Sequence, residues 1–492
     1  MASPQLQIKN SFYYLSGVIL GNVISFLTLP FFTRALTPQD YGLLALTQVY
    51  AVFASGLGNL GLPLIYERNF FQYREKRESA ALLYGTLLVV LASFGIVGIL
   101  TYFFRNQISM ILMGSGQYTH LILLSFFIAA ITSIKTYYLV YYKNTEQAKK
   151  YFWYIIDENI LGTLCSLSFV LYFHVGVVGM LMGQLIASGV VALIASAHFF
   201  QELPPAFHWP ILRESFRLSV PLTPRVFLNF ASTQFDKYIL GFVGSLGGVG
   251  VYSIGQRVSS TIFTFMTAIQ NVFAPQVYAR MFGQGDKKGN TIGPYLTPFA
   301  YVSSGAALFV VLFSEEIITF LTPPTYHEAI DITIVLSLMY ALMFFGKIPQ
   351  LLYAKKTGLI SLLTFSSLLI LVGAMIPSIR VWGTVGAAWG MFIGTTISGI
   401  ISFLVSQKYY PIYWEYRRLV GIYSILFVSA FGLLAFRSFE IDYVVRIIFK
   451  ICMIIVYWNI GVRIGILKKV LFLAIIRIVG GFLFPKRFSS QQ

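Results

Sequence analysis

Residues 218–282 decide the fold of this chain; they read LSVPLTPRVFLNFASTQFDKYILGFVG and then SLGGVGVYSIGQRVSSTIFTFMTAIQNVFAPQVYARMF. The stretch predicts two membrane-spanning helices joined by a glycine-rich turn at residues 244–250. Both helices carry charges at depths where lipid disfavours them by a few kcal/mol or more. Arg225, Asn229 and Asp236 share one face of the first helix at helical spacing, and Arg257 lies on the second. Polar faces within an apolar helix pair indicate a solute path through a helix bundle.

The whole chain has the composition of an integral membrane protein. Its 492 residues are 57% hydrophobic and 11% charged, whereas soluble domains contain roughly 25% charged residues. The 2 cysteines and 5 scattered histidines form neither a disulfide framework nor a metal-site spacing, so we expect no metal and no cofactor. Lys and Arg in cytoplasmic loops explain the net charge of +17, and we expect no nucleic-acid partner.

Apolar segments of about 20 residues predict fourteen transmembrane helices. The segments must be helical because an open strand cannot satisfy its backbone hydrogen bonds in lipid. We place them at residues 11–33, 41–66, 80–104, 118–140, 152–173, 175–198, 217–242, 250–275, 294–314, 332–353, 358–379, 384–406, 418–437 and 443–466. Residues 470–484 are apolar but contain Arg477, so we expect a helix lying in the membrane interface.

The loop charges predict the orientation. Lys and Arg gather in one set of alternate loops, which includes residues 68–77, 143–150 and 280–288, whereas the opposite loop at residues 314–331 is acidic. Positively charged loops stay in the cytoplasm. We therefore expect both the N-terminus and the C-terminus to be cytoplasmic.

The chain repeats itself after six spans. Lys135 and Lys347 lie in the matching stretches IKTYYLVYYKNT and GKIPQLLYAKKT, which are 212 positions apart (347 − 135 = 212). Further matches lie at similar offsets: Tyr66 with Tyr278, Gly42 with Gly250, Gly176 with Gly383, Gly179 with Gly386, and Gly183 with Gly390. Because six is even, the two copies share their orientation, as in transporters with a central site between two lobes.

We therefore expect an all-α integral membrane protein with two six-helix lobes in parallel repeat. The N-lobe is residues 1–206 and the C-lobe is residues 207–412. Residues 413–492 add two C-terminal helices and the interfacial helix.

Three motifs resemble the Wzx-type polysaccharide flippases of the MOP superfamily, which export O-antigen and capsule units. They are RALTPQDYGLLAL at 34–46, FDKYILGFVGSLGGVGVYSIGQ at 235–256 and VWGTVGAAWG at 381–390. The resemblance implies a MATE-like fold in the bacterial inner membrane. It implies alternating-access transfer of undecaprenyl-diphosphate-linked oligosaccharide from the inner to the outer leaflet, for surface polysaccharide biosynthesis. The implied partners are this cargo, membrane lipids and the polysaccharide polymerase machinery.

Two other functions compete with this interpretation. A multidrug or small-solute antiporter of the same superfamily usually has twelve spans and an embedded acid, for which only Asp236 is eligible. A membrane enzyme such as a sugar polymerase needs catalytic groups in large external loops, and these loops are short, so we expect no enzyme. Lipid II flippases also have fourteen spans, but residues 358–379 lack the acid of their sodium site.

The chemistry of such a cargo predicts the binding residues. A diphosphate requires cations, for which arginine is well suited, and sugars require hydrogen-bonding groups. We expect the cargo to contact Arg225, Arg257, Lys135, Lys347, Asn229, Gln48 and Asn59. Arg225 is the leading candidate, because no acidic partner lies near it in the sequence.

Each of these candidates has a structural alternative. Asp236 and Arg257 lie at similar depth on either side of one turn and can form a structural ion pair. The two lysines can extend to the lipid headgroups, and Gln48 and Asn59 can join helices. We interpret the nearby acids Asp157 and Glu158 as a cap at a helix N-terminus.

Overall fold

The structure, a computed structural model, describes residues 4–73, 75–224, 233–282, 289–347 and 350–466. Within these ranges the secondary structure is helical, without a strand. The same ranges contain 10 helices that are long and apolar enough to cross a membrane. The expected all-α membrane architecture is thereby confirmed, and the count of fourteen spans stays a prediction.

The chain divides into two compact units. Unit 1 comprises the described residues within Met1–Ile254, Ile318–His327 and Ser378–Ala387, and unit 2 comprises those within Gly255–Ile317, Glu328–Pro377 and Ala388–Gln492. Unit 1 therefore includes segments from both copies of the sequence repeat. The predicted lobes, residues 1–206 and 207–412, stay a prediction.

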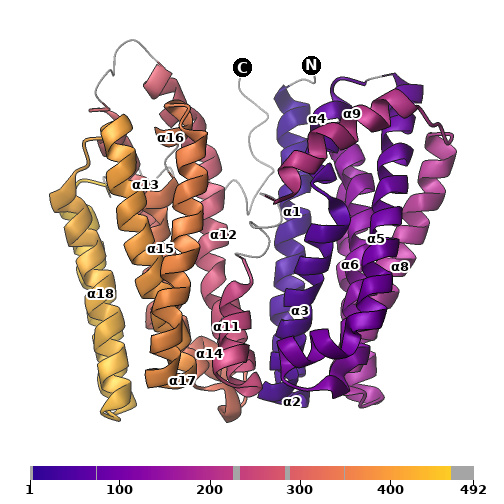
Figure 1. Cartoon of the computed structure of the whole chain (residues 1–492). Helices are drawn as coiled ribbons and strands as arrows, with labels where there is room; N and C mark the ends of the chain where they lie inside the picture. Colours follow the sequence, from indigo (N-terminus) through magenta and orange to yellow (C-terminus); the bar gives the residue numbers. More distant parts are fainter. Residues whose placement is uncertain (1–3, 74, 225–232, 283–288, 348–349, 467–492) are drawn as a thin grey trace, which may run out of the picture. The chain divides into compact units, whose positions relative to one another are not determined.

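Unit 1 is built mainly from the helices up to α11 among the described residues, most of which are labelled in Figure 1. They are α1 (Pro4–Leu27), α2 (Leu29–Ala35), α3 (Pro38–Asn59), α4 (Leu62–Phe70), α5 (Lys76–Met113), α6 (Thr119–Asn144), α7 (Ala148–Leu167), α8 (Gly176–Glu202), α9 (Trp209–Ser219) and α11 (Phe235–Val243). Helix α7 packs against α1 and α8, and α6 packs against α3, α5 and α8. These contacts bury polar side chains that include Lys135 and Asn59.

Unit 2 takes most of the remaining helices, although residues 246–254, 318–321 and 378–387 of three of them belong to unit 1. They are α12 (Leu246–Phe282), α13 (Ile292–Leu312), α14 (Ser314–Leu321), α15 (Ala329–Leu342), α16 (Gln350–Tyr353), α17 (Thr357–Tyr409), α18 (Tyr416–Ser438) and α19 (Tyr443–Arg463). Both α13 and α15 pack against α18, which in turn packs against α19. Helix α17 breaks at Trp382 and Gly383, where the glycine has a φ of 57°. The break falls between the predicted spans 358–379 and 384–406.

The central hairpin differs from its prediction. Helix α9 ends at Ser219 and α11 begins at Phe235, so the expected span at 217–242 is not one uninterrupted helix over the described residues. Helix α12 begins at Leu246, inside the predicted turn. Most glycines of that turn therefore lie in a helix, and Gly250 lets another backbone approach closely. Residues 225–232 and the expected interfacial helix at 470–484 lie outside the described residues.

Candidate functional site

The structure does not describe the side chains of three predicted cargo contacts. Arg225 and Asn229 lie outside the described residues. Lys347 ends a short 3₁₀ helix, Met343–Lys347, and its side chain is also outside the described part. Their roles in binding stay predictions.

Lys135 forms an ion pair between two helices of unit 1. Its Nζ on α6 contacts Oε2 of Glu158 on α7, and only 5% of Lys135 is exposed. Helix α7 begins at Ala148 and has no acidic residue in its first turn, so the interpretation of Glu158 as an N-terminal cap is wrong. The pair neutralises a lysine charge within a helix bundle, where an unpaired charge would be costly.

Asn59, at the end of α3, joins this helix to α6 within unit 1. Its Nδ2 donates to Oγ of Ser133 at 2.9 Å, and its Oδ1 accepts from the hydroxyl of Tyr137 at 3.1 Å. Asn59 is 6% exposed, whereas Gln48, eleven residues earlier on α3 (59 − 48 = 11), is exposed. Of these two amides, only Gln48 presents its side chain to the surface of unit 1.

Asp236 is buried at the start of α11 and has a neutral partner. Its Oδ2 accepts from the hydroxyl of Tyr252 at 2.8 Å, and both residues are almost fully buried. The neighbouring Lys237 donates from Nζ to Oε1 of Gln234 at 2.8 Å. Arg257 is half-buried on α12 and belongs to unit 2, whereas Asp236 belongs to unit 1. The ion pair between Asp236 and Arg257 stays a prediction.

Matching segments of the two repeat copies meet within unit 1. A Cβ added at Gly42 would lie 1.8 Å from the carbonyl oxygen of Leu246, and one at Gly250 would lie 1.9 Å from that of Pro38. The starts of α3 and α12 therefore touch through their backbones. Only glycine permits this approach at either position.

A second set of contacts surrounds this glycine pair. The Tyr326 hydroxyl donates to the carbonyl of Leu36 at 2.8 Å, and its ring meets that of Tyr41 edge-on at 5.7 Å. The Thr33 hydroxyl donates to the carbonyl of Leu321 at 2.8 Å. By the predicted orientation, these contacts lie at the outer end of the helices, where they join the first copy of the repeat to segments of the second.

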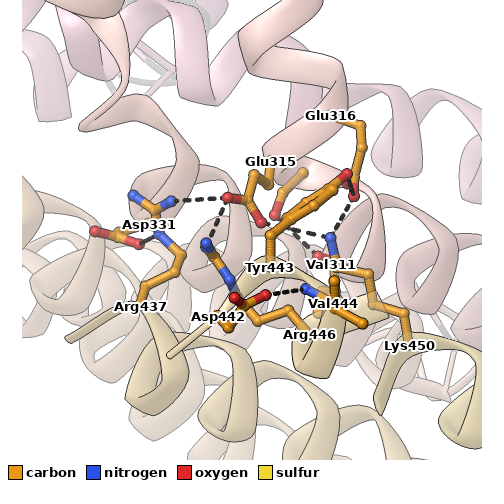
Figure 2. A network of polar contacts seen from close by, with 11 residues as sticks. Val311, Glu315, Glu316, Asp331, Arg437, Asp442, Tyr443, Val444, Arg446 and Lys450 are labelled. Carbon is orange, nitrogen blue, oxygen red and sulfur yellow. Dashed lines mark hydrogen bonds and ion pairs between the residues drawn. The ribbon is translucent and has the colours of Figure 1, made fainter. Parts of the chain in front are cut away.

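Unit 2 contains a network of ion pairs that joins α18 and α19 to α14 and α15, as Figure 2 shows. Arg446 donates to Glu315 at 2.6 Å, and Lys450 donates to Glu316 at 2.5 Å and lies 3.5 Å from Glu315. The Nε of Arg437 donates to Asp331 at 2.7 Å. The acids come from α14 and α15, whereas the bases come from α18 and α19. The acidic loop at 314–331 is thus neutralised by bases far along the chain.

Helix α19 has a second attachment deeper in unit 2. The ring of Tyr457 stacks on that of Tyr301 at 4.6 Å with an interplanar angle of 10°. Its hydroxyl lies 2.6 Å from that of Ser304. Because Lys450 and Tyr457 both hold α19 against other helices, these two residues have structural roles in unit 2.

The spacing of Lys135 and Glu158 in the sequence is consistent with their ion pair. Lys135 precedes Thr145 by ten residues, and Glu158 follows Gln147 by eleven (145 − 135 = 10; 158 − 147 = 11). Two residues equally far from the connection between antiparallel helices lie at similar depth. Asp236 and Arg257 stand in the same relation to their turn, which is why the sequence predicts a pair there as well.

The family of the chain follows from comparison with known proteins. The family model described as "Polysaccharide biosynthesis protein" matches residues 7–277, which is more than half of the chain. This chain belongs to that family. The resemblance to polysaccharide exporters of the MOP superfamily is thereby confirmed. No match was found among curated protein sequences.

Solved structures show the fold of this polysaccharide biosynthesis protein. The lipid II flippase MurJ in an inward closed conformation is 16% identical with a TM-score of 0.63, covering 93% of this chain and 100% of MurJ. The MATE transporter VcmN of Vibrio cholerae is 16% identical with a TM-score of 0.54, covering 82% of this chain and 96% of VcmN. The MATE multidrug transporter DinF-BH is 18% identical with a TM-score of 0.54, covering 83% and 96%.

Identities this low show the fold alone, and the fold is that of MurJ and the MATE transporters. Family and fold together describe a multi-pass membrane protein of polysaccharide biosynthesis with the fold of these transporters.

Proposed function

We propose that this protein is a flippase for undecaprenyl-diphosphate-linked oligosaccharides. It moves them from the inner to the outer leaflet of the bacterial inner membrane for surface polysaccharide biosynthesis. The observation that carries this proposal is the family match over residues 7–277, in a chain with the fold of a lipid flippase. A polysaccharide biosynthesis transporter requires a glycan cargo, and such glycans are assembled on a lipid.

The backbone contact of Gly42 and Gly250 supports alternating access. It joins the two repeat copies without interlocking side chains, so it can separate and form again without repacking a core. In this proposal the contact, with Tyr326 beside it, closes the outer end while cargo enters from the inner leaflet. Its opening then releases the cargo outward.

The cargo head requires positive charge and hydrogen-bonding groups. Arg225, Arg257 and Lys347 supply the cations that hold the diphosphate in this proposal, because arginine in particular can donate two aligned hydrogen bonds. Asn229 and Gln48 supply amides for the sugars. Lys135 and Asn59 already have partners inside unit 1, so we assign them to holding the helices in place.

The lipid tail remains in the membrane during transfer, because its apolar surface has no reason to leave lipid. Helices α18 and α19 stand outside the sequence repeat and border this path in the proposal. We also propose that the product passes to polysaccharide polymerase machinery, and that both termini are cytoplasmic.

Arg225 provides the test of this function. Cells lacking the gene are complemented with the wild type, Arg225→Ala or Arg225→Lys, and surface polysaccharide, lipid-linked oligosaccharide and membrane protein level are measured. We expect Arg225→Ala to abolish surface polysaccharide and to accumulate its lipid-linked precursor at normal protein level. Arg225→Lys should retain part of the activity, because the charge survives and the bidentate geometry does not.

Two results would reject the proposal or part of it. If cells lacking the gene keep their surface polysaccharide and instead become sensitive to toxic drugs, the protein is a small-solute antiporter. If Arg225→Ala exports normally, Arg225 does not hold the diphosphate.

A further inference from the structure

Unit 2 contains a pocket with a volume of about 430 Å3. Its walls come from α12, from the segment that contains α16, and from both halves of α17. Small-molecule sites typically have volumes of about 300–1,000 Å3. By the predicted orientation, the pocket lies toward the cytoplasmic ends of these helices, on the side from which cargo is loaded.

The lining combines hydroxyl and amide groups with apolar side chains. The polar members are Gln270, Tyr278, Thr364, Ser367, Ser402 and Ser406. Leu351, Ile360 and Leu363 are among the apolar members, and no charged side chain belongs to the described lining. This composition does not suit a phosphate, which requires cations. The hydroxyls of Thr364 and Ser367 donate to the carbonyls of Ile360 and Leu363. A lipid chain would meet the hydroxyls of Ser402 and Ser406 with hydrocarbon alone, whereas a neutral sugar has hydroxyls for them and apolar C–H faces for the leucines.

The pocket lies in the second copy of the sequence repeat, and matched glycines show which residues of the first copy correspond to its lining. Gly176 has a φ of 63° and begins α8, and Gly383 has a φ of 57° at the break that divides α17. The helical segments after these two glycines correspond to each other in the sequence repeat. A Cβ at Gly183 would meet the backbone of Ser166 at 2.4 Å, and one at Gly390 would meet that of Met375 at 2.5 Å. The end of α8 and the end of α17 are therefore structural equivalents.

Ser406 stands at the position of Phe199 in this comparison, since both follow the matched glycine by sixteen residues (406 − 390 = 199 − 183 = 16). Phe199 is fully buried and its ring stacks on that of Tyr138 at 4.5 Å. It also meets Tyr142 at 5.0 Å. The first copy thus fills this place with aromatic rings, whereas the second has a serine and a cavity.

Ser402 stands at the position of Ala195, a buried residue without a polar side chain (402 − 195 = 207). Tyr278 matches Tyr66, which is 1% exposed and packs against Tyr137. Tyr278 is only half-buried and lines the pocket. An aromatic ring on a pocket wall suits the C–H face of a sugar ring.

We propose that this pocket of unit 2 binds neutral sugar rings of the lipid-linked cargo. The inference rests on the proposed function and assigns it a glycan subsite apart from the cations that hold the diphosphate. Ser402 and Ser406 hydrogen-bond the sugar hydroxyls, and Leu351, Ile360 and Tyr278 contact the apolar ring faces.

A filling substitution tests the pocket in cells. Ser406→Phe places in the second copy the side chain that the first copy already has. We expect surface polysaccharide to fall about tenfold, the change that a loss of about 1.4 kcal/mol in cargo binding produces when export follows the fraction of protein that holds cargo. The matched control is Leu404→Phe, on the exposed face of the same helix, and it should leave polysaccharide unchanged. Normal export by Ser406→Phe at normal protein level would overturn the inference.

A protection experiment identifies the occupant and does not depend on export. Ser406→Cys is introduced with Cys165→Ala and Cys452→Ala, and the rate of maleimide labelling is measured on the purified protein. One probe is the lipid-linked oligosaccharide extracted from cells lacking the gene, and the other is undecaprenyl diphosphate without sugar. Retention of each probe by the protein is measured in parallel. We expect the glycan-bearing lipid to slow labelling about tenfold and the sugar-free lipid to have no effect.

The other outcomes separate the inference from the function on which it rests. Equal protection by both lipids would place the diphosphate or the tail in the pocket and overturn the sugar assignment. Retention of the glycan-bearing lipid without protection would leave the flippase function standing and overturn the pocket. If neither lipid is retained, the flippase function fails and the pocket assignment fails with it.

Discussion

Gly42 and Gly250 occupy reciprocal positions in unit 1. Each approaches the residue four positions before the other, Gly42 at the carbonyl of Leu246 and Gly250 at that of Pro38. The two glycines are also matched in the sequence repeat. A pseudo-symmetric backbone contact of this kind has no room for a side chain on either helix.

Gly42→Ala and Gly250→Ala should each weaken transport. The added Cβ would fall within 2 Å of a backbone oxygen that cannot move by a rotamer change. Overpacking typically costs about 1–3 kcal/mol, which shifts the population of the closed contact by about fivefold or more. Surface polysaccharide and membrane protein level are measured together. Gly189→Ala, where no atom lies within 4 Å of an added Cβ, is the control; full activity of both variants would show that the contact is not required.

Lys135 and Glu158 should behave as one structural unit. Removing one partner of a buried pair typically costs about 3–5 kcal/mol, so Lys135→Met and Glu158→Gln should each lower the protein level in the membrane. The double variant removes both charges and should recover the level and the transport. A double variant with normal level and no export would instead return Lys135 to the cargo-binding residues.

This pair also shows what the sequence could and could not predict. The sequence predicts the spans and the depth of their charges, because the length of an apolar segment and the position of a charge within it are local properties. It also predicts the repeat, because the spacing of matched residues can be compared directly between two segments. The contact of Lys135 with Glu158 depends on how α6 and α7 are rotated about their axes. Likewise, the acidic residues of the loop at 314–331 can be recognised in the sequence, but their ion-pair partners cannot. These partners, Arg437, Arg446 and Lys450, lie on helices outside the repeat, so no corresponding pair in the first copy predicts the contact.

Glu316 should make the stability of unit 2 depend on acidic pH. Burial on its own raises the pKa of Glu316, but hydrogen bonds from Lys450, its own backbone N–H and Tyr443 outweigh this effect and hold the pKa below its ordinary value. A lowered folded-state pKa stabilises the protein above the unfolded value. That stabilisation is lost as the pH falls through the lowered pKa.

The measurement is the melting temperature of the purified protein in detergent. Glu316→Gln should melt a few degrees below the wild type at neutral pH, about 1–3 °C. The difference should shrink in acid below about pH 4.3, the ordinary pKa of a glutamate. Glu440→Gln, at an exposed carboxylate, is the control. A difference that stays constant across this pH range would contradict the assigned role of the Glu316 charge.

Reporter fusions should establish the orientation and the number of spans. Fusions after Ala206 and at the C-terminus should report cytoplasm, and a fusion at Pro324 in the acidic loop should report the outside. The reason is that Lys and Arg gather in the loops on the first side. An external C-terminus would exclude fourteen spans with a cytoplasmic N-terminus.

Transfer of the glycan-bearing lipid between leaflets is the central claim, and reconstituted vesicles test it most directly. Lipid-linked oligosaccharide is incorporated into both leaflets with or without the purified protein, and a membrane-impermeant glycosidase is added outside. The flippase function predicts that nearly all the glycan is cleaved when the protein is present. Cleavage limited to the outer-leaflet share, as in protein-free vesicles, would contradict it.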